Sequence, residues 1–163
     1  MSSYYLRQLT DSDEQLVREM LYYALYVPQG QPPFLRSVVD SPEVAKYFRD
    51  WGRPGDMGIA AIDLTSSEVI GAAWVRCFTA KEKGYGYIDD QTPELSIAVL
   101  PNFRGKGIGT ELLEKLIEQS RLQVRALSLS VSIDNPAVRL YRRLGFEVID
   151  ESEHSLVMRK TLQ

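Results

Sequence analysis

The chain has 163 residues, with 19 Lys and Arg against 22 Asp and Glu, a formal net charge of -3 at pH 7. This balance argues against nucleic acid as the main partner, because no basic block is present that could cover a phosphate backbone. The length and the 44% of apolar residues predict one domain over 1–163 with a buried core, and the single cysteine excludes an intrachain disulfide.

The N-terminal segment MSSYYLRQLTDSDE lacks the basic residues and the apolar run of a signal peptide. No later stretch is apolar and long enough to span a bilayer, so we expect a soluble cytoplasmic protein with no membrane partner. Alternation over 4–9 predicts a first strand. Asp11 followed by Glu14 resembles a capping box, which predicts a helix that starts there and ends before Pro28.

The next part of the chain reads as a loop followed by a second helix. Residues 28–40 contain three prolines and a glycine, which is typical of a loop. Ser41 is placed to cap a helix with Pro42 at its first position, and Gly52 is placed to end it. The apolar face expected for this helix consists of Val44, Ala45, Tyr47, Phe48 and Trp51.

Two β-rich runs, 57–64 and 69–78, come next and are separated by the polar residues 65–68. This separation predicts an antiparallel hairpin. Cys77 lies in the second run, and we expect it to be a core residue rather than a nucleophile. The polar stretch 79–92, rich in glycine and tyrosine, is predicted to be a mobile loop.

A strand, a glycine-rich turn and a helix then follow one another directly. The strand is predicted over 95–100 and is broken at 101–102, after which 104–109 reads RGKGIG and enters an amphipathic helix. Glycines let the backbone approach a phosphate, and the unpaired N–H groups of a first helical turn point at it. Arg104 and Lys106 add two positive charges. The segment therefore predicts an anion-binding turn, the alternative being a glycine turn with solvent-facing basic residues.

The spacing of this turn excludes two common phosphate-binding motifs. In a Walker loop the lysine is followed by Ser or Thr, whereas Lys106 is followed by Gly107. A dinucleotide fingerprint would need a third glycine at position 110, which is occupied by Thr110.

The rest of the chain predicts a helix to about residue 121, a strand over 126–133, a short helix that starts at Asn135 and Pro136 and stops at Gly145, and strands over 146–149 and 155–159. The strand–helix–strand crossover should pair 95–100 with 126–133 in parallel. We therefore expect an α/β fold with a mixed central sheet flanked by about four helices, and with the turn at the carboxyl end of the strands, where ligands bind. The one histidine, His154, lies near a late strand or turn, without a neighbouring nucleophile or metal-ligand pattern, so no metal site is expected.

Two segments resemble motifs of the GNAT family of N-acetyltransferases. The first runs from Val99 through RGKGIGT to Leu113, and the second is NPAVRLYRRLGF over 135–146. The second departs from the family pattern in one respect, since Val138 stands where Ala is preferred and Ala137 comes one place early. The resemblance covers 94–146. It implies a GNAT-like acyl-CoA N-acyltransferase fold, acetyl-CoA as cofactor, and transfer of its acetyl group to a primary amine of a small molecule or peptide.

The resemblance also implies roles for individual residues. The cofactor pyrophosphate would be held by Arg104, Gly105, Lys106, Gly107, Ile108, Gly109 and Thr110, and the pantetheine arm would pair with the strand residues Ile97, Ala98 and Val99. Asn135 would hydrogen-bond the cofactor arm, although a plain helix cap is the alternative. Tyr141 would lie near the thioester sulfur, although core packing is the alternative.

Acetyl transfer needs a base, an oxyanion donor and an acid. An alkyl amine has a pKa of about 10, so a base must remove a proton before attack. Glu94 is the candidate base, acting through a water, unless it is only a surface carboxylate at a strand end. A backbone N–H of 97–99 would stabilise the oxyanion. Tyr141 would protonate the leaving thiolate, whose pKa is about 8.5.

The acceptor is less well defined by the sequence. Asp89 and Asp90 could attract a cationic acceptor, and six aromatic residues are expected around it: Tyr22, Tyr23, Tyr26, Phe34, Tyr85 and Tyr87. Such a lining suits a polyamine, an amino sugar or a peptide amine, but the same residues could be core or homodimer contacts. A second function also stays open, a non-catalytic acyl-CoA-binding regulatory module that binds acetyl-CoA without releasing thiol.

Overall fold

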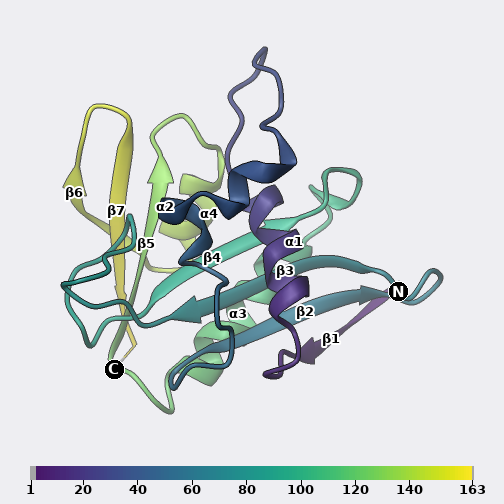
Figure 1. Ribbon diagram of the computed structural model, residues 1–163, viewed down its shortest axis with the longest axis horizontal. Coiled ribbons are helices and arrows are strands. Elements are labelled where there is room, and N and C mark those ends of the chain that lie inside the picture. Colours follow the sequence, from purple (N-terminus) through teal and green to yellow (C-terminus); the bar gives the residue numbers. More distant parts are fainter. Residues whose placement is uncertain (1–2, 163) are drawn as a thin grey trace.

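The computed structural model describes residues 3–162, and within them seven strands form one mixed sheet in the order β1-β2-β3-β4-β5-β7-β6 (Figure 1). The strands are β1 Tyr4–Gln8, β2 Met57–Asp63, β3 Val69–Arg76, β4 Glu94–Val99, β5 Ala126–Ser132, β6 Glu147–Glu151 and β7 Ser155–Thr161. The helices are α1 Glu14–Ala24, α2 Pro42–Ala45, α3 Ile108–Ser120 and α4 Ala137–Arg143, with 3-10 turns at Arg36–Asp40 and Pro101–Phe103. The predicted fold class and order of elements are confirmed.

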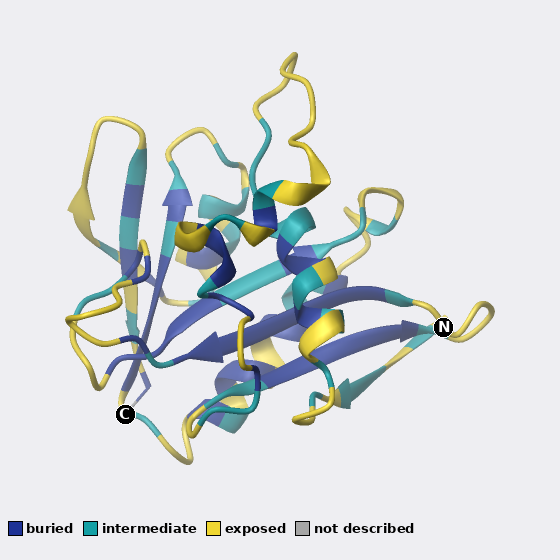
Figure 2. Ribbon diagram, in the orientation of Figure 1, coloured by how far each residue is buried: buried dark blue, intermediate teal, exposed yellow. Residues whose placement is uncertain are grey.

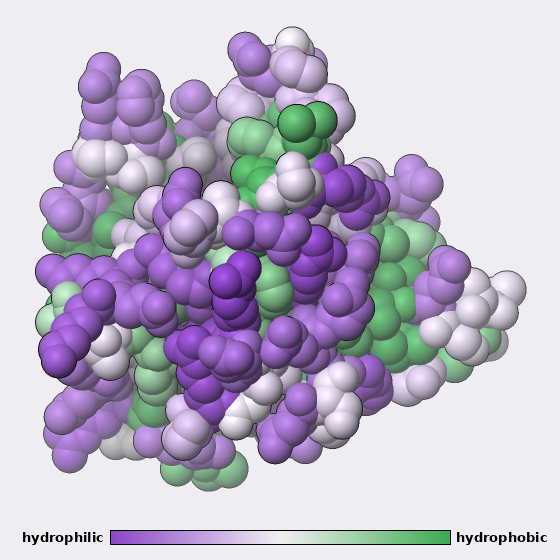
Figure 3. Space-filling model, viewed as in Figure 1, coloured by the Kyte–Doolittle hydropathy of each residue, from purple (hydrophilic) through white to green (hydrophobic). Residues whose placement is uncertain are grey.

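The sheet separates two apolar layers. On one face Ala60, Trp74 and Ala98 pack with residues of α1 and α2, and on the other face the alternate residues of the same strands pack against α3. Figure 2 shows the consequence, a central pair of strands that is buried on both faces. The molecule presents a largely hydrophilic surface on the α1 and α2 side, with an apolar group over the segment that follows α1 (Figure 3).

β4 and β5 are parallel, as predicted, but they pair over a very short length. Among the described residues their register contains one pair, Glu94 opposite Ser128, and the Ser128 N–H donates to the Pro93 carbonyl. Each strand is fully paired on its other side, β4 with β3 and β5 with β7. The two strands therefore diverge beyond Glu94, and the β4 edge from Leu95 to Val99 is open toward β5.

The predicted capping box at the start of α1 is wrong. The helix begins at Glu14, with Asp13 rather than Asp11 at its N-cap and without a side-chain cap. The Asp13 carboxylate is bound instead by the Arg7 guanidinium, at 2.9 Å, and by the Thr10 N–H, at 2.7 Å. The ion pair with Arg7 lowers the pKa of Asp13 and joins β1 to the start of α1.

The second helix is shorter than predicted. α2 ends at Ala45, its Ser41 side chain donates to the Val38 carbonyl instead of capping, and Asp50 adopts a positive φ of 57°. The apolar residues that follow α2 are nevertheless buried as expected. The helix does not continue because the carbonyls of Lys46 and Arg49, which a longer helix would use internally, accept hydrogen bonds from Arg76.

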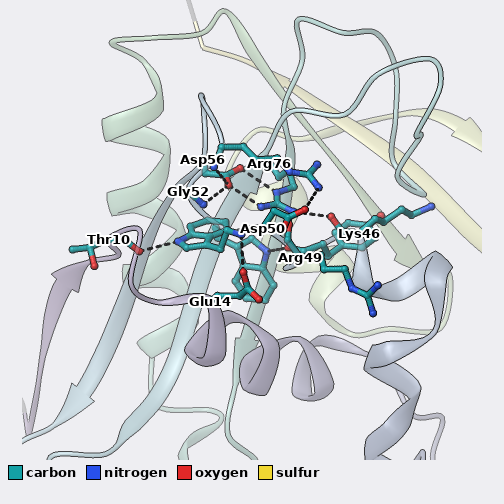
Figure 4. A network of polar contacts seen from close by, with 12 residues as sticks. Thr10, Glu14, Lys46, Arg49, Asp50, Gly52, Asp56 and Arg76 are labelled. Carbon is teal, nitrogen blue, oxygen red and sulfur yellow. Dashed lines mark hydrogen bonds and ion pairs between the residues drawn. The ribbon is translucent and has the colours of Figure 1, made fainter.

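A buried ion pair holds the segment after α2 against the sheet (Figure 4). Arg76 at the end of β3 is 1% exposed, and its Nη2 lies 2.8 Å from Asp56 Oδ2. The same Asp56 oxygen accepts the N–H groups of Gly52 and Arg53, and the Arg76 guanidinium lies 5.5 Å from the Trp51 ring. Every polar group of this pair therefore has a partner, as burial of charge requires.

Candidate functional site

The glycine-rich turn leads from β4 into α3 with its backbone in the conformation that glycine favours. Gly105 and Gly107 have φ values of 75° and 87°, and Gly107 is the N-cap of α3 without a side-chain hydrogen bond. A Cβ added at either glycine would meet no atom within 4 Å, so the space in front of the turn is open. The first N–H groups of α3 have no acceptor inside the helix and face this end.

The two basic residues of the turn differ in their surroundings. Arg104 Nε donates to the Val99 carbonyl at 2.8 Å, and its Nη2 lies 3.4 Å from the Tyr23 carbonyl. Lys106 Nζ lies 5.4 Å from the Phe103 ring centroid. Arg104, although exposed, therefore contacts both the end of β4 and the end of α1.

A cleft of about 840 Å³ extends from this turn along the open β4 edge, between the end of α1 and α4. The predicted cofactor residues that line it are Ile97, Ala98, Val99, Arg104, Gly105, Gly107, Ile108, Gly109, Thr110, Asn135 and Tyr141. Lys106 is absent from this lining. The cleft thus joins the predicted anion-binding turn to an edge of β4 that no strand pairs with, where the Val99 carbonyl accepts the hydrogen bond from Arg104.

A smaller cavity of about 290 Å³ adjoins the cleft. Six residues line both spaces: Ala24, Leu25, Tyr26, Ile97, Asn135 and Tyr141. Glu94, Tyr47 and Tyr85 line only the smaller cavity. Tyr141 and Asn135 therefore lie where the two spaces meet, and Glu94 lies on the far side of that junction.

Tyr141 is a buried residue of α4 with its ring against Phe146. It is 7% exposed, the ring centroids are 6.1 Å apart in an edge-on arrangement, and burial raises the pKa of Tyr141 to about 12. Within residues 3–162 its hydroxyl has no hydrogen-bond partner. Tyr141 is thus packed in the core and also lines both cavities, and its position near the thioester sulfur stays a prediction.

Asn135 precedes α4 and its side chain binds the start of that helix, while its predicted contact with the cofactor arm stays a prediction. Its Oδ1 accepts the Ala137 N–H at 2.9 Å, which orders the start of the helix. The amide nitrogen of the same side chain has no partner among the described residues and is available at the cavity junction.

Glu94 is buried, in contrast to the surface carboxylate that was the alternative. It is 4% exposed, its Oε2 accepts the Tyr47 hydroxyl at 2.5 Å, and its Oε1 accepts the Gly86 N–H at 3.0 Å. Burial raises the pKa of Glu94 to about 7, while the hydrogen bonds from Tyr47 and Gly86 and the charge of Lys46 oppose that rise. The carboxylate is therefore oriented and able to exchange a proton near neutral pH.

Tyr47 is a site residue that the sequence analysis missed. Its hydroxyl donates to Glu94 and accepts the Tyr85 N–H at 2.7 Å, and its ring stacks on the Tyr85 ring at 6.2 Å. Helical spacing assigned Tyr47 only to an apolar face. Its distance of 47 residues from Glu94 left no local signal for the contact.

The loop before β4 is closely packed on this site. A Cβ at Gly84 would lie 2.2 Å from Glu94 Oε1, and one at Gly86 would lie 2.7 Å from the Leu129 backbone. Asp89 and Asp90 bond within their own loop, Asp89 to the N–H of Gln91 and Asp90 to the Tyr87 hydroxyl. Neither carboxylate lines a cavity, so their predicted role in attracting the acceptor is not supported.

The predicted aromatic lining divides between the spaces. Tyr22, Tyr23, Tyr26 and Phe34 line the cleft, Tyr26 and Tyr85 line the smaller cavity, and Tyr87 lines neither. Cys77 is half-buried and its thiol pKa is raised by burial, which disfavours the reactive thiolate. His154 lies in the exposed turn between β6 and β7.

Two further properties concern the described residues as a whole. Over 3–162 the structure contains no group of three or more His, Cys, Asp or Glu side chains placed to hold a metal ion. In the same range no helix combines the length and apolarity that crossing a bilayer would require.

The positive φ of the helix cap leads to a stability prediction. Gly107→Ala should lower the free energy of unfolding by about 1–2 kcal/mol, because an L side chain at φ 87° is strained even in open space. Gly109, which lies inside α3, is the matched control, since a Cβ there would lie 3.8 Å from the Ile97 and Val99 side chains, an ordinary contact. Gly109→Ala should therefore raise the free energy of unfolding by about 0.5–1 kcal/mol. Urea unfolding of both variants measures the pair, and equal changes of the same sign would contradict this account of the turn.

Residues 21–146 match the model of the acetyltransferase (GNAT) family. An uncharacterized N-acetyltransferase of Methanocaldococcus jannaschii is 47% identical over 53 residues, 31% of this chain and 24% of that protein. An L-methionine sulfoximine/L-methionine sulfone acetyltransferase of Pseudomonas aeruginosa is 42% identical over 59 residues, 35% of this chain and 34% of that protein. The chain thus spans about a quarter to a third of these curated relatives.

Among solved structures, the PaiA N-acetyltransferase of Thermoplasma acidophilum, in complex with coenzyme A, superposes with a TM-score of 0.67. The superposition covers 98% of this chain and 99% of that one at 18% identity. At that identity the likeness establishes the fold.

Proposed function

The chain belongs to the acetyltransferase (GNAT) family, and from this membership we propose that it transfers the acetyl group of acetyl-CoA directly to a primary amine of a small molecule or peptide. The observation that carries the proposal is the position of Glu94. A buried carboxylate with a pKa of about 7 lines a cavity that meets the cleft at the Tyr141 hydroxyl. A base is thereby separated from an acid by a space of small-molecule size.

In this proposal the cofactor occupies the cleft. Its diphosphate is bound by the N–H groups from Gly105 to Thr110, with Arg104 beside them and Lys106 at the rim. Its pantetheine arm pairs with the open edge at Ile97–Val99, and the free amide nitrogen of Asn135 donates to the arm. The open β4 edge and the first turn of α3 support this placement, because no strand pairs with the edge beyond Glu94 and the first N–H groups of α3 have no acceptor inside the helix.

The reaction then takes place at the junction of the two spaces. Glu94, ionised above about pH 7, accepts a proton from the ammonium group through a water, and the neutral amine attacks the acetyl carbonyl carbon. A backbone N–H of 97–99 donates to the oxyanion. The C–N bond forms, the C–S bond breaks and Tyr141 gives its proton to the leaving sulfur. The second proton that the nitrogen loses then restores the Tyr141 hydroxyl through solvent. The burial that raises the pKa of Tyr141 would also raise the pKa of a thiol beside it, so the two pKa values would stay close enough for proton transfer.

The test combines a binding and a turnover measurement. We expect calorimetry to detect coenzyme A binding, and a thiol-release assay with acetyl-CoA and a panel of amines to detect turnover. Binding without release from any amine would instead favour the acyl-CoA-binding regulatory module. Absence of binding would overturn the proposal.

Tyr141→Phe tests the assignment of the acid. It removes one hydroxyl and leaves the ring contact with Phe146, so kcat should fall about ten- to a thousandfold with little change in coenzyme A affinity. Thiol release under saturating substrates measures kcat, and calorimetry measures affinity. An unchanged kcat would remove Tyr141 as the acid.

A further inference from the structure

The smaller cavity has a polar floor that follows from strand alternation. On β5 the residues Leu127, Leu129 and Val131 pack in the core shared with α3, so Ser128, Ser130 and Ser132 lie on the opposite face. On β4, Ala98 packs in the core shared with α1, so Glu94 and Ser96 lie on that same opposite face. One carboxylate and a row of serines therefore occupy adjoining strands.

The row of serines continues onto the next strand. In the register of β5 with β7, Ser132 lies opposite Ser155, and both residues line the cavity together with Ser96 and Ser130. Within the described residues the hydroxyls of Ser96, Ser130 and Ser132 have no side-chain hydrogen-bond partner, and that of Ser155 contacts Ser152 Oγ at 3.0 Å. These hydroxyls can donate and accept, so they are suited to hydroxyl groups of a ligand.

The lining of the smaller cavity contains acidic groups but no basic side chain. Its ionisable residues are Glu94 and the tyrosines Tyr26, Tyr47, Tyr85 and Tyr141, with no Lys, Arg or His among the lining residues. Lys46 is the cation whose charge lowers the pKa of Glu94, and it lies outside the lining of the smaller cavity. Lys46 Nζ donates to the Lys83 carbonyl at 2.6 Å and lies 5.1 Å from the Tyr85 ring. The cavity lining thus offers one carboxylate for an ammonium group and no cationic side chain for an anion.

On the basis of the proposed function, we infer that the acceptor is a compact, hydroxyl-bearing monoamine with no other charge, of the amino alcohol or amino sugar class. Its ammonium group faces Glu94, and its hydroxyls bind Ser96, Ser130, Ser132 and Ser155. A volume of about 290 Å³ accommodates one such molecule. The transfer step is the one described above, with the same bonds formed and broken.

The inference makes other classes of amine poor acceptors for definite reasons. A carboxylate or phosphate would enter a lining that contains no cation, and an unpaired charge is costly to desolvate. The second ammonium group of a diamine would find no second carboxylate. A peptide offers mainly carbonyls, which only accept hydrogen bonds, whereas the four serine hydroxyls can both donate and accept.

The test compares matched amines in the thiol-release assay with acetyl-CoA, with each rate corrected for the fraction of free amine. Serinol (2-amino-1,3-propanediol) is paired with L-serine, in which a carboxylate replaces one hydroxymethyl group, and glucosamine is paired with glucosamine 6-phosphate. Putrescine, L-methionine sulfoximine and a serine-containing dipeptide amide complete the panel. We expect kcat/KM for serinol and for glucosamine to exceed that of the partner bearing a carboxylate or phosphate by about tenfold or more. A preference for an amine that bears an acidic group, for putrescine or for the dipeptide would overturn the inference.

A pair of serine variants tests the floor of the cavity directly. Ser130→Ala should reduce the preference for serinol over 2-aminopropane by about three- to tenfold, mainly through KM. Ser128→Ala is the matched control, because Ser128 lies on the same face of the same strand and lines neither cavity, and its buried hydroxyl has no partner among the described residues. We expect it to leave the preference unchanged. A Ser130→Ala variant with the wild-type preference would overturn the role of the serines.

These results separate the inference from the function on which it rests. Transfer to amines in the wrong order of preference would reject the acceptor class and leave the acetyltransferase proposal standing. Retained coenzyme A binding with no transfer to any amine would reject both.

Discussion

Glu94→Gln should lower kcat/KM by about a hundredfold to ten-thousandfold at pH 8, the largest activity loss that we expect from a single substitution. Gln has nearly the shape of Glu and can still accept the Gly86 N–H, so the cavity should persist while proton acceptance is lost. Thiol release measured against pH gives the result. Wild-type kcat/KM should rise as the pH passes through about 7, where Glu94 ionises, and the variant should lack that rise.

Tyr47→Phe is the control that separates a base from a structural carboxylate. The Tyr47 hydroxyl donates to Glu94 and lowers its pKa, so removal of that hydroxyl should raise the pKa of Glu94. The acidic limb of the profile should therefore move to higher pH, with most of the plateau activity retained. A limb that stayed in place in Tyr47→Phe, or that persisted in Glu94→Gln, would exclude Glu94 as the titrating base.

The stability of Glu94→Gln shows whether its activity loss is caused by unfolding. The pKa of Glu94 is raised on folding from 4.5 to about 7, so its contribution to stability is fully present below pH 4.5 and is lost as the pH rises through 7. At pH 8 the ionised carboxylate therefore costs stability, on the order of 3 kcal/mol. The Gln variant should accordingly be more stable than the wild type at pH 8, and its advantage should shrink toward pH 4, as thermal unfolding at the two pH values will measure.

Asp56→Ala should lower the free energy of unfolding by about 3–5 kcal/mol, the largest stability loss that we expect. The substitution leaves the Arg76 guanidinium, 1% exposed, without its anion, and it leaves the N–H groups of Gly52 and Arg53 without an acceptor. Denaturant unfolding with a constant m-value would measure the loss.

The double variant Asp56→Ala with Arg76→Met is the control for this ion pair. It removes both charges, so its loss should be smaller than the sum of the two single losses. Additive losses, or a cost below about 1 kcal/mol for Asp56→Ala, would show that the pair is not buried in the way described. Arg76 also donates to the carbonyls of Lys46 and Arg49, which lie in the same segment as Tyr47. Asp56→Ala alone, which leaves Arg76 without its anion, should therefore also disturb the hydrogen bond from Tyr47 to Glu94.

The parts of the fold that sequence predicted are those fixed by local chemistry. The turn between β4 and α3 was found because Gly105 and Gly107 are needed for their backbone angles, whatever the rest of the chain does. The parallel pairing of β4 with β5 followed from the chain order alone. The capping box at Asp11 failed because Asp13 had a stronger partner in Arg7, which belongs to β1.

The parts that sequence did not predict depend on contacts between distant segments. Nothing near Glu94 in the chain indicates that Tyr47 and Gly86 enclose it, so its burial and raised pKa were not foreseen. The serines of β5 were visible as an alternating pattern. Which face they occupy became clear only once α3 was seen to cover the leucines.

The divergence of β4 from β5 has a consequence for how firmly the two parts of the sheet are joined. Within the described residues the sheet consists of two blocks, β1–β4 and β5–β7–β6, whose facing strands pair only at Glu94 and Ser128, while α3 packs with residues of both blocks in one core. A ligand bound in the opening would contact both blocks, because residues of β4 and of the segment before α4 line it. We therefore expect occupation of the cleft to restrain the position of Glu94 relative to β5.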